Sequence, residues 1–131
     1  MKLTKAQQMM LDIEKIVGGS INVIYGTVIF DTVLNVDEMK KAVNEIYRIN
    51  PILRTLLVSV DGYTEQFVED YSPRDIEVIE FLSKEEVHKY ANENAQIPFD
   101  MNGSLCSLKI VISKDFCGVA YKIYHILSDA W

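Results

Sequence analysis

Apolar residues recur with the spacing of one helix face in three stretches of the chain. A residue that caps helices precedes each stretch, namely Thr4, Asn35 and Ser83, and a Gln or Glu follows three positions after each cap. A Gly-Gly pair ends the first stretch, and a proline follows shortly after each of the other two. The pattern therefore predicts three helices, over residues 5–17, 36–49 and 84–96.

Two of these helices have faces that the sequence assigns to the core or to solvent. The first has an apolar stripe that we expect to face the core, formed by Ala6, Met9, Met10, Ile13, Ile16 and Val17. Met39 of the second helix is interpreted, like Met9 and Met10, as core filler, since methionine adapts to irregular gaps. The opposite face of the second helix is typical of a solvated surface, with Lys40, Lys41, Asn44 and Glu45.

Six stretches rich in β-branched and aromatic residues predict strands. They cover residues 21–30, 54–60, 63–68, 76–81, 106–112 and 116–125. Asp61-Gly62, between the second and third, supplies the positive φ angles that a two-residue hairpin turn needs. Helices interspersed with these strands predict an α/β (α+β) fold, a two-layer sandwich with a mixed, largely antiparallel sheet.

Composition limits the number of domains, the partners and the location that we expect, and it does not change the predicted fold. The chain has 131 residues, which is enough for one domain but not for two. Its net charge of −6 repels phosphate backbones and anionic membranes, so we expect neither nucleic acid nor a membrane as a partner. No apolar run is long enough for a membrane span or a signal peptide, and we expect a cytoplasmic protein.

The two cysteines are not predicted to form a disulfide. Cys106 and Cys117 fall on the two arms of a hairpin, and in that register Cys117 faces Ile112 while Cys106 lies far along the other arm. A reduced cysteine packs as a small hydrophobic side chain. We therefore expect two buried free thiols.

The two histidines are too few for a metal site, which needs three or four ligands. His88 lies on the polar side of its predicted helix and is interpreted as a surface residue. His125 ends the last strand, four residues before Asp129. On this spacing alone, a histidine satisfied within the core is favoured over a positioned base.

Four segments change that interpretation. Residues 124–131, Tyr-His-Ile-Leu-Ser-Asp-Ala-Trp, resemble the HHxxxDGW signature of the condensation domains of nonribosomal peptide synthetases and of related chloramphenicol-acetyltransferase-like acyltransferases. Residues 3–8 resemble the S-x-A-Q opening of that family, residues 50–55 its H-E-x-L-R-T segment, and residues 98–105 its P-F-D-L-x-x-G-P-L segment. Four matches in the family's order are specific to the superfamily, though not to one member.

The resemblance implies that residues 1–131 are an N-terminal lobe. A complete domain of this family has two similar lobes with the catalytic tunnel between them, so a C-terminal lobe would be missing. His125 matches the second histidine of the signature, which is the one assigned to catalysis. Tyr124 replaces the first histidine and is interpreted as packing, Ala130 replaces the glycine, and Trp131 ends the motif.

The resemblance also implies the chemistry. An amine or alcohol attacks an acyl thioester on a 4′-phosphopantetheine arm that the substrate's carrier protein brings, and no bound cofactor or metal is expected. His125 either takes the proton of the nucleophile as a general base or stabilises the charged transition state. Asp129 is structural in the family and pairs with an arginine, for which Arg54 is the match. This pair would fix the loop that carries His125.

Three functions remain open from the sequence. The leading one is amide-bond formation between a carrier-bound acyl or peptidyl thioester and an acceptor amine, incomplete in this lobe. The second is a non-catalytic lobe that binds a carrier or partner domain without turnover. The third is an acyltransferase of the same superfamily that uses coenzyme A. In each case we expect an exposed apolar face for the second lobe, through which the chain self-associates.

Overall fold

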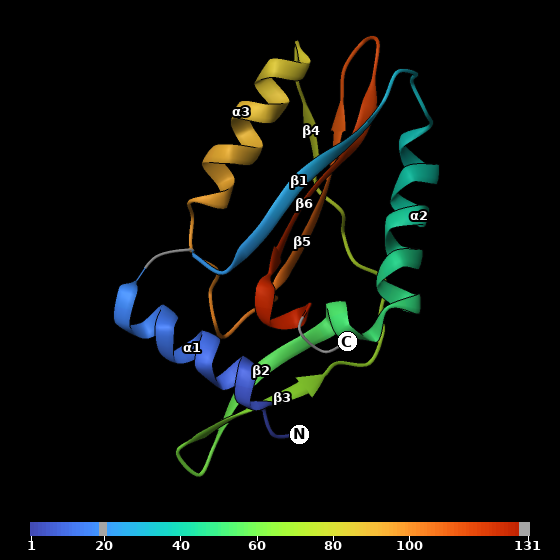
Figure 1. The fold of residues 1–131 in the computed structure, drawn as a ribbon. Helices are drawn as coiled ribbons and strands as arrows, with labels where there is room; N and C mark the ends of the chain where they lie inside the picture. The colour runs from blue at the N-terminus through green and yellow to red at the C-terminus, as the bar shows by residue number, and fades with distance from the viewer. Residues whose placement is uncertain (19–20, 129–131) are drawn as a thin grey trace.

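Each predicted helix begins at the capping residue that the sequence indicates (Figure 1). The computed structural model describes residues 1–18 and 21–128. Within them, the helices are α1 (Lys5–Val17), α2 (Val36–Ile49) and α3 (Lys84–Ala95). In α1 the Thr4 side chain accepts a hydrogen bond from the backbone of Gln7, and the Gln7 side chain accepts one from the backbone of Thr4. This reciprocal pair satisfies two amide groups that the first turn leaves open.

The strands agree with the predicted ones to within a few residues. They are β1 (Val23–Phe30), β2 (Thr55–Val60), β3 (Tyr63–Val68), β4 (Val78–Glu80), β5 (Cys106–Ile112) and β6 (Cys117–Tyr124). The predicted strand over 54–60 begins one residue later, because Pro51–Arg54 forms a short 3-10 helix, η1. A second 3-10 helix, η2 (His125–Leu127), ends β6 one residue earlier than predicted. The strand predicted over 76–81 shortens to β4, which pairs only with residues 110–112.

The strands form one four-stranded sheet and one hairpin. The sheet order is β1-β6-β5-β4, with antiparallel pairing except between β4 and β5. β2 and β3 pair with each other, and the turn between them has positive φ at Asp61 and Gly62, as the Asp-Gly pair predicts. The predicted mixed, largely antiparallel sheet of an α/β fold is confirmed.

Helices lie on both faces of the four-stranded sheet (Figure 1). Val87 of α3 packs with Val111 and Ala120 on one face. On the other face, residues of α2 pack against alternate residues of β5, in a core that includes Met39, Val43, Tyr47, Cys106 and Ile110. The sheet therefore lies between α3 and α2, so the structure has one layer more than the predicted two-layer sandwich.

The predicted inward stripe of α1 is wrong. Met9, Ile16 and Val17 are 59%, 83% and 61% exposed, whereas Gln7 and Leu11 are the buried residues of the helix. Because residues four apart share a face, Gln7 and Leu11 define the side of α1 that packs. A polar side chain takes the central core position since its amide finds partners there. The interpretation of Met9 as core filler is therefore also wrong, while Met39 is buried.

Both cysteines are buried free thiols, as predicted. Cys117 pairs with Ile112 across the hairpin, while Cys106 lies opposite Ile123. His88 is exposed on α3, also as predicted. Among the described residues, no group of three or more His, Cys, Asp or Glu is placed to hold a metal ion, and no helix is long and apolar enough to cross a bilayer.

Candidate active site

His125 lies where β6 leaves the sheet and turns into η2. Its backbone N–H donates to the Asn22 carbonyl at 2.7 Å, which continues the β1 register for one residue beyond the last paired position. The turn closes locally with the Ser128 N–H donating to the His125 carbonyl at 3.0 Å. Ile126 and Leu127 of η2 are 1% and 4% exposed, so the two residues that follow the histidine anchor the turn in the core.

The hydrogen bonds of Ser128 favour one tautomer of the His125 ring. The Ser128 hydroxyl donates to the His125 carbonyl at 2.9 Å, and its oxygen lies 3.4 Å from Nδ1 of the ring. Because the hydroxyl proton is already used, the oxygen can only accept from Nδ1–H. That arrangement leaves the Nε2 lone pair free, which is the form a general base needs. Ser128 was not singled out from the sequence, although it occupies a variable position of the signature.

Tyr124 lies on the opposite side of the strand from His125 and is fully buried. Its ring packs against Phe99 of the Pro-Phe-Asp loop, with 6.3 Å between ring centroids. Burial, with the negative charge of Glu14 nearby, raises the pKa of Tyr124 to about 12. A phenol held neutral in the core fits a packing role.

The start of β1 ties the His125 backbone to α1. Asn22, which accepts the His125 N–H, donates from its side chain to the Met10 carbonyl at 3.3 Å and to the Glu14 carboxylate at 2.9 Å. No sequence signal distinguished Asn22 from other loop residues, because its role depends on how the chain after α1 folds back onto that helix and on the approach of His125, which is remote along the chain. The turn that carries His125 is thereby fixed relative to the first helix.

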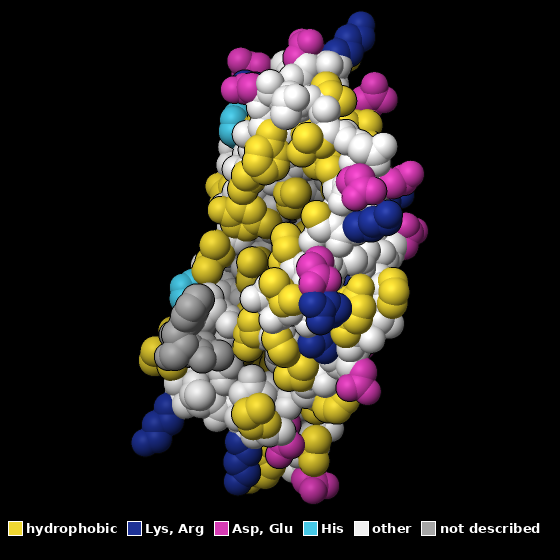
Figure 2. All heavy atoms as spheres, turned by 90° about the vertical axis from the view of Figure 1, so that its right-hand side faces the viewer, with side chains coloured by type: hydrophobic (Ala, Val, Ile, Leu, Met, Phe, Trp, Pro, Cys, Tyr) yellow, Lys and Arg dark blue, Asp and Glu magenta, His cyan; other side chains and the backbone are white. Residues whose placement is uncertain are grey.

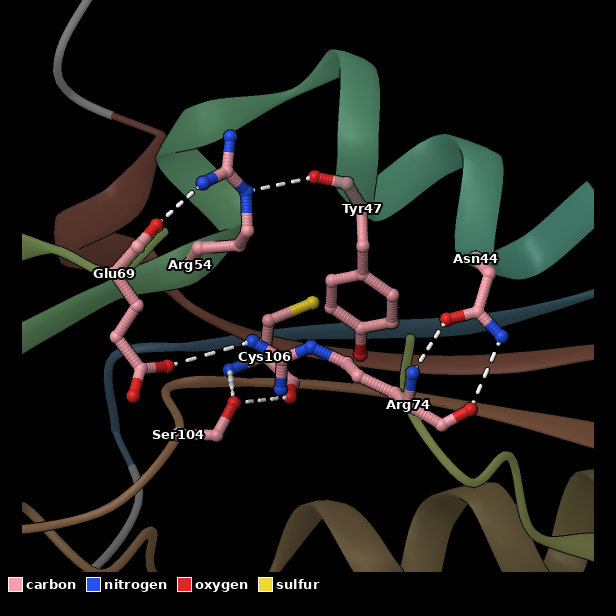
Figure 3. A network of polar contacts seen from close by, with 7 residues as sticks. All are labelled: Asn44, Tyr47, Arg54, Glu69, Arg74, Ser104 and Cys106. Atoms are coloured by element: carbon pink, nitrogen blue, oxygen red, sulfur yellow. Dashed lines mark hydrogen bonds and ion pairs between the residues drawn. The ribbon is translucent and has the colours of Figure 1, made fainter. Parts of the chain in front are cut away.

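Arg54 joins α2 to the chain that follows β3 (Figure 3). Its Nε donates to the Tyr47 carbonyl at 3.0 Å, and its Nη1 donates to the Glu69 carbonyl. These bonds satisfy a carbonyl at the end of α2, where helical partners run out. The predicted partner Asp129 lies outside the described residues, as do Ala130 and Trp131, so the Arg54–Asp129 pair stays a prediction.

A second arginine organises the same region and was missed from the sequence (Figure 3). The Arg74 guanidinium lies 4.3 Å from the Tyr47 ring centroid and 3.7 Å from the Glu69 carboxylate. The Asn44 side chain accepts from the Arg74 N–H at 2.7 Å and donates to its carbonyl at 3.0 Å. The interpretation of Asn44 as a solvated residue is therefore wrong, because its amide is matched to the backbone of the segment between β3 and β4.

An apolar sheet face extends from the histidine along β1 and β6. Register places six side chains on it: Ile24, Val28, Phe30, Val119, Tyr121 and Ile123. α2 covers the β5 side of the sheet but leaves Ile24, Val28 and Phe30 36%, 49% and 44% exposed. Figure 2 shows hydrophobic side chains gathered along this side of the molecule. Exposed apolar area of this kind marks a surface for binding.

The comparison with protein families identifies the class to which this protein belongs. The Condensation domain family matches residues 1–131 of the sequence, and the chain is a member of that family. The comparison with curated protein sequences found no match.

Solved condensation domains have the same fold. The first condensation domain of the CDA synthetase is similar over 95% of this chain and 35% of its own, with a TM-score of 0.80 and 12% identity. The starter condensation domain of the rhizomide synthetase RzmA is similar over 95% of this chain and 33% of its own, with a TM-score of 0.83 and 12% identity. The chain thus spans about a third of the length of these relatives.

Proposed function

We propose that residues 1–131 form the N-terminal lobe of a condensation-type acyltransferase domain, with His125 as its catalytic residue. The observation that carries the proposal is the fixed turn of His125, which combines a buried anchor with a ring whose Nδ1 faces the Ser128 hydroxyl. In a member of the condensation family, that geometry supplies a positioned base at the edge of an open apolar face.

The reaction we propose is amide-bond formation. An acceptor amine attacks the carbonyl carbon of an acyl or peptidyl thioester, the new C–N bond forms, and the C–S bond to the pantetheine arm breaks. His125 Nε2 takes the amine proton, and the thiolate that leaves is protonated in turn. Alternatively, a protonated His125 ring stabilises the charged transition state, and it does so from the same position.

The substrate's carrier protein would bring the 4′-phosphopantetheine arm, so the lobe itself needs no resident cofactor. The apolar sheet face is the surface against which we place the C-terminal lobe, because a tunnel requires a second wall beside His125. Without that wall two substrates are not held together, and the entropic advantage of a bound pair is lost. The isolated chain is therefore proposed to be inactive.

The test is an acyl-transfer assay with a loaded carrier protein and an acceptor amine. We expect the 131-residue chain to give no amide above the rate without protein, and a longer protein that contains both lobes to give amide unless His125 is changed to Ala. Turnover by the chain alone would overturn the need for a second lobe. An undiminished rate in the His125→Ala protein would overturn the catalytic role.

The same assay separates the two alternative functions. The starter condensation domain of RzmA has been solved in complex with C8-CoA, which favours testing an acyl-CoA donor in place of the loaded carrier. Product from the CoA donor alone would identify a coenzyme A-dependent acyltransferase. Carrier binding without turnover by the two-lobe protein would identify a non-catalytic lobe.

A further inference from the structure

Gln7 of α1 is a buried amide whose four hydrogen-bonding positions are all used. It is 1% exposed. Its Oε1 accepts from the Thr4 N–H at 2.9 Å and from Gln66 Nε2 at 3.3 Å. Its Nε2 donates to Gln66 Oε1 at 3.3 Å and to the Ile126 carbonyl at 3.2 Å. A primary amide has two donors and two acceptor lone pairs, so none is left without a partner.

These bonds join three segments that are remote in sequence. Thr4 caps α1, Gln66 belongs to β3, and Ile126 is the residue that follows His125 in η2. Gln66 is itself fixed, because its backbone N–H donates to the Met1 carbonyl at 2.8 Å and its side chain donates to the Lys2 carbonyl at 3.2 Å. The Gln7 amide, which donates to η2, is thus held by both Thr4 and Gln66.

We infer that Gln7 is a positioning residue for His125, an assignment that rests on the proposed function of that histidine. Within the described part of the chain, two hydrogen bonds join the backbone of η2 to remote segments: His125 N–H to the Asn22 carbonyl and Gln7 Nε2 to the Ile126 carbonyl. The bonds from Ser128 are local and move with the turn. The Gln7 bond therefore sets the tilt of the Ile126–Leu127 peptide, one residue beyond the histidine.

The Ile126 carbonyl lies in the core, where no solvent replaces a lost donor. Ile126 is 1% exposed, so removing the Gln7 amide leaves this buried acceptor with no donor among residues 1–18 and 21–128. The turn relieves this cost by rotating the peptide towards another donor, which displaces the His125 ring. A small displacement of a catalytic group costs about 10²-fold in rate.

Gln66 provides the matched control for a merely structural role. Gln66→Met removes the amide–amide pair and leaves the bond from Gln7 to Ile126 in place, whereas Gln7→Met removes both. Both variants lose buried hydrogen bonds and are expected to lower the urea midpoint. Only Gln7→Met is expected to change the environment of His125.

The experiment is an NMR titration of the His125 ring in the 131-residue chain. We expect Gln7→Met to shift or broaden the His125 ring signals and to change the ratio of its neutral tautomers, while Gln66→Met leaves them as in the unmodified protein. Equal changes in the two variants, or unchanged signals in Gln7→Met, would overturn the inference. If Gln7→Met does not fold, Gln7→Glu serves instead, since its carboxylate keeps the acceptors and loses the donor to Ile126.

The readout does not depend on turnover, so it separates this inference from the proposed function. In the two-lobe protein we expect kcat to fall about 10²-fold for Gln7→Met, with KM nearly unchanged, and to fall much less for Gln66→Met. An inactive unmodified protein whose His125 signals still respond to Gln7→Met would refute the proposed function and keep the positioning role. A normal rate in Gln7→Met would refute the positioning role alone.

Discussion

The position of His125 is determined mainly by its backbone. Its N–H is bonded to Asn22 and its neighbours Ile126 and Leu127 are buried, whereas the polar contact of its ring within the described residues is a long one, to Ser128. The side chain beyond Cβ therefore adds little to the stability of the turn. The residues around it are expected to carry the folding free energy of the turn.

His125→Ala is accordingly expected to leave the free energy of unfolding within about 0.5 kcal/mol of the unmodified protein. In the two-lobe protein we expect acyl transfer to fall about 10²–10⁴-fold, which is the range for a general base. Urea unfolding and the amide-forming assay are the two measurements. His88→Ala, on the exposed face of α3, is the control and should change neither. A large loss of stability in His125→Ala would assign it a structural role.

For the pair that we predict between Arg54 and Asp129, we expect the opposite result, which is a large loss of stability on substitution. Arg54 already bonds to the carbonyls of Tyr47 and Glu69, so it lies on an ordered framework against which a carboxylate would be held. Removing one member of a buried ion pair typically costs about 3–5 kcal/mol, against about 0–1 kcal/mol for an exposed pair. Asp129→Ala is therefore expected to lower the melting temperature markedly.

A double-mutant cycle with Arg54→Met and Asp129→Ala measures the pair directly. We expect the two losses in unfolding free energy to be non-additive by more than about 1 kcal/mol. Additive losses would show that the two side chains do not interact, and that Arg54 stabilises the lobe through its carbonyl partners alone.

At the scale of elements, helix starts were predictable because capping is a local property. Thr4, Asn35 and Ser83 each accept the backbone N–H three residues ahead, and neighbouring residues alone decide that bond. The Asp-Gly hairpin was predictable for the same reason. Strand ends were less so, because they depend on segments that are remote in sequence, as in the short parallel pairing of β4 with residues 110–112 of β5.

The face of a helix is not local in this sense, and the error over α1 shows why. The apolar stripe that includes Met9 and Ile13 is a better amphipathic pattern than the side that packs. Gln7 is buried because β3 and η2 present partners for its amide, and neither lies near it in the sequence. The same reason explains why Asn22 and Asn44 were overlooked, since each binds a backbone segment that only the tertiary fold brings close.

Gly118 of β6 provides a test of how closely β1 and β6 pack. A Cβ at this position would lie 2.1 Å from the Val28 carbonyl oxygen, which is backbone and cannot rotate away. Gly118→Ala is therefore expected to cost about 1–3 kcal/mol of unfolding free energy through forced separation of the strands. Gly103→Ala, where the nearest atom is 3.6 Å away, is the control. Equal urea midpoints for the two variants would contradict this account.

At the scale of the whole molecule, the fold leaves the apolar sheet face partly exposed. α2 covers only part of the sheet, and the exposed parts of Ile24, Val28 and Phe30 are left without a neighbour among the described residues. The sequence predicted that an apolar face would exist, through the resemblance to a two-lobed family. It did not indicate which strands would form it, because that depends on the sheet order.

We expect the isolated chain to self-associate through this face. Sedimentation velocity at several concentrations should show the mean mass rising with concentration, since burial of apolar area stabilises association by about 25 cal/mol per Å². Val28→Lys should shift the equilibrium to the monomer. Val60→Lys, at an exposed position of the β2–β3 hairpin, should leave it unchanged. A chain that stays monomeric at every concentration would rule out association through this face.

In the described part of the chain, residues 106–109 of β5 have no strand partner on the β4 side, because β4 pairs with β5 only along residues 110–112. An open edge is where a second chain adds a strand and fibrous aggregation begins. Here the Ser104 hydroxyl donates to the Cys106 carbonyl at 2.8 Å and accepts from its N–H at 3.4 Å, so both backbone groups of Cys106 already have partners. Cys106 is also only 4% exposed, so at this residue the edge of β5 offers no free backbone group to an incoming strand.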